Sequence, residues 1–279
     1  MTNTLQQRIS NRRVGAASAA LALAVVLLSA VTTTQVAQAQ TFTTLHSFDG
    51  TDGANPEAAL VQATNGTFYG TTYRGGAYDL GTVFKITPSG KLTTLYSFCS
   101  QSGCTDGIGP VAGLIQATNG NLYGTTALGG ANSQGTIFKI TPSGALTTLH
   151  SFDGADGSET HAGLIQDTNG KFYGTTTFGG DLNCNPSYGC GTVFSLSVGL
   201  GPFVETLPTS GKVGAAVKIL GTNLTGATSV TFNGTAAVFK VVSKSLITTS
   251  VPTGATTGTV EVTTPKGTLK SNVVFRVKK

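Results

Sequence analysis

The sequence predicts an all-β protein, with propeller-like tandem repeats of four strands followed by an immunoglobulin-like β-sandwich. Two observations predict this fold class. One phrase occurs three times, from Thr43, Thr93 and Thr147, and each copy runs through YGTT to a GT-[VI]-F core. Beyond residue 198 the phrase gives way to short alternating apolar and polar runs between turn residues. A period of about fifty residues with four short strands is typical of propeller blades, and the alternating tail is typical of a sandwich.

Each repeat is expected to form two hairpins. In the first copy the four strands are expected at residues 60–64, 68–72, 83–87 and 92–98. Asn65-Gly66 separates the first two runs, and such a turn usually requires positive φ at both of its residues. Pro88-Ser89-Gly90 separates the second two runs and is also typical of a turn. The second copy repeats both turns, whereas the third keeps only Asn169-Gly170.

The two ends of the repeat region are complementary. Residues 43–48 have the sequence of a last strand, and the third copy lacks its own last strand. These two parts could complete one blade, but three copies are fewer than the four to eight blades typical of propellers. A very small ring, an open stack and a homodimer that completes a six-bladed ring all remain open.

Charge differs between the two halves of the chain. The formal charge is +5, but three arginines lie in the first 39 residues. Residues 40–199 carry net −5, and residues 200–279 carry net +7. The basic tail could meet an acidic polymer or a membrane surface, or its lysines could simply keep it soluble. The repeats contain no basic patch, so the sequence does not support nucleic-acid binding.

Residues 1–39 have the pattern of a secretory signal peptide. Three arginines precede an uncharged stretch from Val14 to Val31, and Ala37-Gln38-Ala39 offers small residues for cleavage between Ala39 and Gln40. An uncleaved signal anchor is the alternative, because the uncharged stretch approaches the length of a membrane span. We expect the mature chain to be secreted or held at the cell envelope and to contain no transmembrane span.

The repeated core resembles a known family. YGTT-x-x-GG…GT-[VI]-F, at Tyr69–Phe84, Tyr123–Phe138 and Tyr173–Phe194, is similar to the GloVer repeat of bacterial surface and secreted proteins, whose tandem copies precede varied C-terminal anchors. The resemblance implies no catalytic residue. It gives a domain organisation of signal peptide at 1–39, three repeats at 40–198 and a separate domain at 199–279.

The C-terminal segment resembles an IPT/TIG domain. A strand ending in Gly221-Thr222-Asn223, the strand Val230–Gly234, the turn Val251-Pro252 and the strand Val273–Val277 carry the resemblance. It implies a small immunoglobulin-like module that serves as a spacer or an interaction domain beside other extracellular domains.

Four cysteines lie in or beside loops where repeats two and three are longer than their neighbours. In an exported protein, local disulfides Cys99–Cys104 and Cys184–Cys190 are the natural interpretation. A four-cysteine metal site is the alternative, but it lacks C-x-x-C spacing and needs two distant loops to converge.

Three aspartates occupy the same place in successive repeats, each followed by glycine: Asp52, Asp106 and Asp156. Aspartates in glycine-rich turns can bind Ca²⁺ through carboxylate and carbonyl oxygens. The alternative is turn chemistry, in which the carboxylate bonds to its own backbone, and we favour it. We expect no other cofactor.

The third repeat has the richest group of ionisable residues: Asp153, Asp156, Glu159 and His161. Paired carboxylates can cleave glycosidic bonds, so a carbohydrate-active hydrolase or lyase is one hypothesis. The sequence contains no nucleophile elbow, P-loop, dinucleotide fingerprint or zinc-protease helix. We therefore favour a non-enzymatic binding or adhesion protein whose partner is a polysaccharide or another envelope protein. A purely structural surface protein is the remaining hypothesis.

Overall fold

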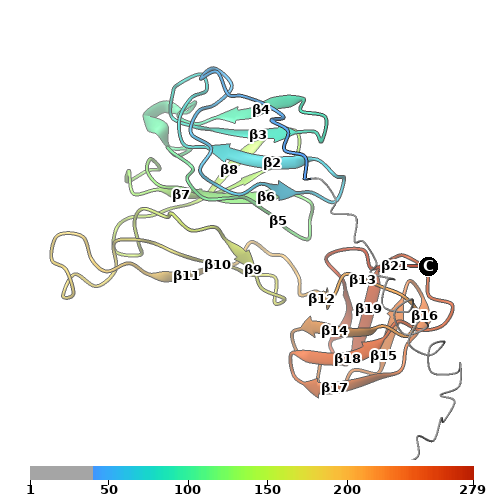
Figure 1. The fold of residues 1–279 in the computed structure, drawn as a ribbon. Helices are drawn as coiled ribbons and strands as arrows, with labels where there is room; N and C mark the ends of the chain where they lie inside the picture. Colours follow the sequence, from blue (N-terminus) through green and yellow to red (C-terminus); the bar gives the residue numbers. More distant parts are fainter. Residues whose placement is uncertain (1–39) are drawn as a thin grey trace, which may run out of the picture. The chain divides into compact units, whose positions relative to one another are not determined.

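A computed structural model describes residues 40–279, so the expected signal peptide and its cleavage after Ala39 lie outside the described residues. The described chain consists of strands, loops and one short 3₁₀ helix, η1 (Ser102–Cys104). The strands form separate small sheets in the repeats and in the C-terminal segment (Figure 1). The prediction of an all-β fold is confirmed.

Each of the first two repeats forms a four-stranded antiparallel sheet, and the third forms a three-stranded one. The first sheet contains β1 (Val61–Gln62), β2 (Phe68–Thr72), β3 (Thr82–Ile86) and β4 (Leu92–Ser97). The second contains β5 (Ile115–Gln116), β6 (Leu122–Thr126), β7 (Thr136–Ile140) and β8 (Leu146–Ser151). The third contains β9 (Ile165–Gln166), β10 (Phe172–Thr175) and β11 (Val193–Leu196).

The first hairpin of each repeat forms where the sequence predicts it, but its turn differs from the expectation. Gly66 has a φ of 84°, whereas Asn65 is not among the residues with positive φ. The Gly66 amide donates to the Ala63 carbonyl at 2.8 Å, and the Asn65 side chain accepts from the Thr67 amide at 3.0 Å. The loop is therefore a longer turn that needs the left-handed conformation at one residue only, and glycine supplies it without a steric cost.

Buried threonines and a close-packed glycine explain the YGTT phrase. The hydroxyl of Thr72 donates to the Arg74 carbonyl at 2.8 Å, and it also lies 2.8 Å from the hydroxyl of Thr82 on β3. The second and third repeats make the same contacts. A Cβ added at Gly70 would lie 2.6 Å from the ring of Phe84, so a larger residue would displace that ring.

The three sheets stack in chain order, each packing one face against its neighbour (Figure 1). The core between the first and second sheets includes Ala63, Tyr69, Val83, Phe98, Leu114, Leu122, Phe138 and Ile140. The core between the second and third includes Ala117, Tyr123, Ile137, Phe152, Leu164 and Phe172. In the first two sheets, the phenylalanine that follows the fourth strand packs edge to face on a phenylalanine of the next sheet. The ring centroids of Phe98 and Phe138 are 5.2 Å apart, and those of Phe152 and Phe194 are 5.3 Å apart.

The C-terminal segment is a β-sandwich, as its alternating pattern predicts. One sheet contains β12 (Val204–Leu207), β14 (Ala216–Gly221), β18 (Leu246–Ser250) and β17 (Phe239–Ser243) in spatial order. The other contains β16 (Thr235–Ala236), β15 (Ser229–Phe232), β19 (Val260–Thr264) and β20 (Gly267–Lys270). A parallel pair, β13 (Ser210–Gly211) and β21 (Arg276–Val277), completes the module.

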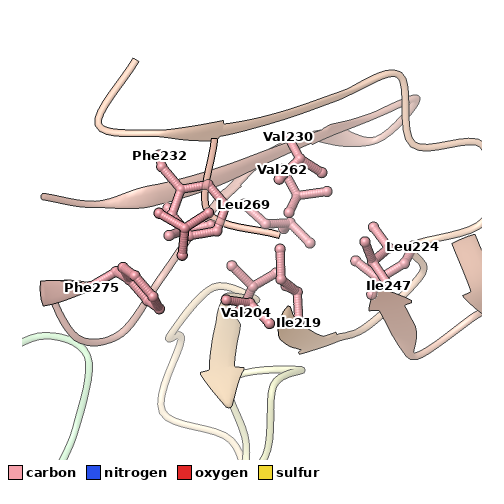
Figure 2. Packing of buried hydrophobic residues seen from close by; sticks show 12 residues of the cluster. Val204, Ile219, Leu224, Val230, Phe232, Ile247, Val262, Leu269 and Phe275 are labelled. Atoms are coloured by element: carbon pink, nitrogen blue, oxygen red, sulfur yellow. The ribbon is translucent and has the colours of Figure 1, made fainter. Parts of the chain in front are cut away.

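The sandwich core forms from the inward-facing residues of both sheets (Figure 2). Val204 and Ile219 come from one sheet, and Val230 and Val262 come from the other. All four are fully buried, so period-two alternation along each strand places one apolar set inside.

One expected element is absent from the described chain. Residues 43–48 have the sequence of a fourth strand, but no strand is assigned there and β11 has β10 as its only strand partner. The three sheets thus form a stack with two open ends within residues 40–279.

Candidate functional site

Asp52 and Asp156 anchor the turns in which they lie. Oδ2 of Asp52 is 2.7 Å from Nε2 of His46, and its Oδ1 accepts from the Asp49 amide at 3.1 Å. Asp156 makes the equivalent contacts with His150, at 2.6 Å, and with the Asp153 amide, at 3.0 Å. Each carboxylate is already engaged by an imidazole and a backbone amide, which is turn chemistry rather than an open ligand set.

Asp106 occupies the same place in the second repeat but is completely buried. Its Oδ2 accepts from the Tyr96 hydroxyl at 2.8 Å and from the Ser100 amide at 3.0 Å. Its Oδ1 has no hydrogen-bond partner among the described residues. Tyr96 therefore takes the role that histidine has in the other repeats.

Asp49 lies beside Asp52, and Asp153 lies beside Asp156, within the same turns. Among residues 40–279, no group of three or more His, Cys, Asp or Glu side chains is arranged to hold a metal ion. Ca²⁺ binding by Asp52, Asp106 and Asp156 stays a prediction, and their hydrogen bonds favour the structural role.

The four ionisable residues of the third repeat do not all line one hollow. Asp153 and Glu159 line one hollow of about 590 Å³, together with Gln134, Phe178 and Tyr188. Asp156 faces His150 instead, and Nδ1 of His161 lies 2.8 Å from the Thr177 hydroxyl. The sequence cluster therefore divides, because neighbours along a turn can face different sides of the sheet.

Glu159 stands at a backbone position that favours glycine. Its φ is 52°, and the equivalent residues Asn55 and Gly109 have φ of 56° and 60°. Asparagine and glycine enter the left-handed region readily, whereas glutamate does so at a cost of about 1 kcal/mol or more. Such a cost at the edge of a hollow is a reason to look for function there.

Asp153 contributes a carboxylate that is held in its ionised form. The backbone amide of Asp156, followed by other hydrogen bonds within the turn, holds the pKa of Asp153 below its ordinary value of 3.8. The Asp153 side chain accepts from the amides of Ala155 and Asp156, at 2.9 and 3.0 Å. It therefore presents a fixed negative charge and hydrogen-bond acceptors to the hollow.

Two aromatic rings that the sequence does not single out complete the hollow. Phe178 occupies the position of Arg74 and Leu128 in the earlier repeats, and Tyr188 lies in the insertion of repeat three. Their ring centroids are 5.5 Å apart. Phe178 could have been found from the sequence, because it is an aromatic residue where the other repeats have arginine and leucine. Tyr188 could not, because the other repeats have no residue at the equivalent position.

The structure forms both disulfides that the sequence predicts, Cys99–Cys104 and Cys184–Cys190. The second one closes the loop that carries Tyr188. Closing so short a loop restricts the loop itself more than it stabilises the whole protein.

No helix within residues 40–279 is both long enough and apolar enough to cross a membrane.

Two family models match the chain. The Gloeobacter/Verrucomicrobia repeat matches residues 29–238, and the IPT/TIG domain matches residues 203–277. Both resemblances suggested by the sequence are thereby confirmed. No curated protein matches the chain.

Solved structures share only a weak likeness. A putative gluconolactonase has 13% identity over 79% of this chain and 75% of its own, with a TM-score of 0.34. A gluconolactonase from Xanthomonas campestris has 14% identity over 79% and 76%, with the same TM-score. A gamma-CGTase from alkalophilic Bacillus clarkii has 20% identity over 56% of this chain, which spans only 24% of that enzyme, with a TM-score of 0.27. These values are too low to extend the activities of those proteins to this chain.

Proposed function

The chain belongs to the Gloeobacter/Verrucomicrobia repeat family, and from that premise we propose that it is a secreted or cell-envelope binding protein whose ligand is a polysaccharide. The observation that carries the proposal is the hollow of the third repeat. Its lining differs from the equivalent surfaces of the first two repeats, although the three strands of its sheet correspond to the first three strands of theirs. Variation confined to loops on a constant scaffold is typical of binding surfaces.

The chemistry of the lining suits a sugar. Phe178 and Tyr188 offer ring faces for the apolar C–H faces of pyranose rings, and Tyr188 is 63% exposed. Asp153 and Glu159 accept hydrogen bonds from hydroxyl groups, and the Gln134 amide both donates and accepts. A few polar groups beside aromatic surface are typical of ligand pockets.

Hydrolysis is the competing function, because the hollow contains two carboxylates. A glycosidase needs one carboxylic acid whose raised pKa keeps it protonated. The pKa of Asp153 is displaced in the opposite direction, and Asp156 and His161 are engaged elsewhere. Asp153 therefore does not supply that acid, and Asp156 and His161 do not line the hollow.

The proposed location outside the cytosol agrees with the presence of two disulfide bonds. Both disulfides are local, and such bonds persist in oxidising compartments outside the cytosol. The IPT/TIG segment supports an interaction role beside the repeats.

The test uses purified residues 40–279 on a panel of neutral and acidic polysaccharides. We expect calorimetry to detect binding, and Tyr188→Ala to weaken it by about tenfold through loss of the stacking surface. Tyr78→Ala is the matched control, because Tyr78 is an exposed tyrosine in the corresponding loop of the first repeat. Its affinity should equal that of the parent protein.

Two outcomes would overturn the proposal. If the protein bound none of the polysaccharides in the panel, a purely structural role would be the better hypothesis. Release of sugar fragments that is abolished by Glu159→Gln would show that the hollow is catalytic.

A further inference from the structure

The third sheet ends at an unpaired strand. In the first two sheets β4 and β8 cover the outer edges of β3 and β7, whereas β11 has no such neighbour within the described chain. Val193 on β11 is 81% exposed, although its equivalents Val83 and Ile137 are 0% and 1% exposed. An apolar residue of a core position is thus left at an open edge, which is a ready template for another strand.

Residues 44–48 have the sequence of the missing strand. They pack against the first sheet in the same way that β4, the fourth strand of the first sheet, packs against the second sheet. Phe48 packs edge to face on Phe84 at 5.2 Å, as Phe98 packs on Phe138. A Cβ added at Gly90 would lie 2.5 Å from the Leu45 carbonyl oxygen, and one at Gly144 would lie 2.7 Å from that of Leu95. The segment is therefore already placed as a fourth strand is placed against the following sheet.

The backbone of the same segment is unpaired within the part of the chain that the structure describes. None of the amides or carbonyls of residues 44–48 bonds to another backbone group of residues 40–279. Leu45 remains about half exposed. The segment is thus seated by its side chains, and its edges are available for a partner strand.

The two outer faces of the stack are also complementary. The open face of the first sheet forms an apolar hollow of about 330 Å³ whose lining includes Leu60, Phe68 and Phe84. Their equivalents on the second sheet, Leu114, Leu122 and Phe138, are buried against the first sheet. The opposite open face, on the third sheet, exposes Ile165 and Val193, which are 63% and 81% exposed.

We propose that two copies of this chain close into one ring, in which residues 44–48 of each copy pair with β11 of the other. The register follows from the internal repeats. Since Ile137 pairs with His150 and Phe138 with Thr148, Val193 pairs with His46 and Phe194 with Thr44 of the second copy. The third sheet of one copy then covers the open apolar face of the first sheet of the other.

The occupant is a second copy rather than the same chain. Within one chain the segment lies on the first sheet without reaching β11, and three sheets fall below the four to eight blades of closed propellers. Two copies together supply six sheets, which lies within that range. A two-fold arrangement uses each open end of the stack once, leaves neither end uncovered and limits the assembly to a pair.

The first test measures the mass of residues 40–279 in solution by light scattering. We expect twice the chain mass, and Val193→Asp should reduce it to one chain mass by placing a charge in the interface. The exposure of Val193 means that this variant should keep its fold, which circular dichroism checks. Val238→Asp is the control, because Val238 is an exposed valine of the sandwich, 92% exposed, and should leave the dimer intact.

The second test traps the register. The double variant His46→Cys/Val193→Cys should give a covalent dimer with a short bifunctional thiol reagent, seen on a non-reducing gel. Ser47→Cys/Val193→Cys is the control, because a shift of one residue points the side chain to the other face of the sheet. A monomeric parent protein, an open polymer, or a cross-link within single chains would each overturn the proposal.

Discussion

Tyr96 donates its hydroxyl to Oδ2 of the buried Asp106 carboxylate at 2.8 Å, where the first and third repeats place a histidine against the equivalent aspartate. Burial raises the pKa of Tyr96, and the neighbouring Asp106 carboxylate adds to the rise. The phenol therefore remains protonated and continues to donate well above neutral pH. One scaffold thus accepts two different rings, provided that each presents a donor to the same carboxylate.

Tyr96→Phe should lower the free energy of unfolding by about 1–3 kcal/mol, because it removes a donor from a buried charged group. Urea unfolding at pH 7 measures the change. Tyr78→Phe is the matched control, since the Tyr78 side chain is exposed and makes no hydrogen bond to a described residue. Equal losses in the two variants would contradict the assigned role of Tyr96.

Two adjacent threonines of β6 separate the effect of a hydrogen bond from that of burial. Thr125 and Thr126 are both completely buried. The Thr126 hydroxyl donates to the Leu128 carbonyl at 2.9 Å and accepts from the Thr136 amide at 3.0 Å, whereas the Thr125 hydroxyl has no partner among the described residues. Valine has nearly the same shape as threonine without the hydroxyl.

Thr126→Val should therefore cost about 1–3 kcal/mol, since it leaves the amide of the buried Thr136 without its acceptor. Thr125→Val should be neutral or stabilising, because it removes a polar group that is buried without a partner. Thermal unfolding of the two variants side by side is the measurement. A loss of stability in Thr125→Val as large as that in Thr126→Val would mean that the Thr125 hydroxyl is hydrogen-bonded after all.

The repeating hairpins could be predicted because their causes are local. Gly66 and its equivalents supply the left-handed turn residue, and the apolar runs on either side fix which face of each strand is buried. The turn type was wrong because Asn65 and Gly66 alone do not show that the closing hydrogen bond begins at Ala63. The pairing of the two ends of the stack could not be decided, because it depends on contacts between segments that are far apart in the chain.

The candidate site was only partly predictable. Asp153 and Glu159 were selected from their charge, and the structure places both at one hollow. Phe178 and Tyr188 were missed because nothing in the local sequence indicates that an insertion folds back on a repeat position. His161 and Asp156 were grouped with the acids by proximity in sequence, but the turn directs them to Thr177 and His150.

Glu159 offers a test of whether the protein carries backbone strain at its proposed site. Glu159→Gly should be more stable than Glu159→Ala by about 1 kcal/mol, because only glycine enters the left-handed region without a steric cost. Both variants lose the carboxylate, so both should lose affinity for the polysaccharide to the same extent. Chemical unfolding with calorimetry separates the two effects, and equal stability would show that the position is unstrained.

The acid sensitivity of the third repeat should depend on Asp153. Because hydrogen bonds from the turn hold its folded-state pKa below 3.8, ionised Asp153 stabilises the fold above that pH. This contribution should be lost as the pH falls through the lowered folded-state pKa. The unfolding temperature of the parent protein should therefore exceed that of Asp153→Asn at pH 7, and the difference should shrink as the pH falls below about 3.8. A difference that stays constant from neutral to acid pH would mean that the charge of Asp153 does not contribute to the stability of the turn.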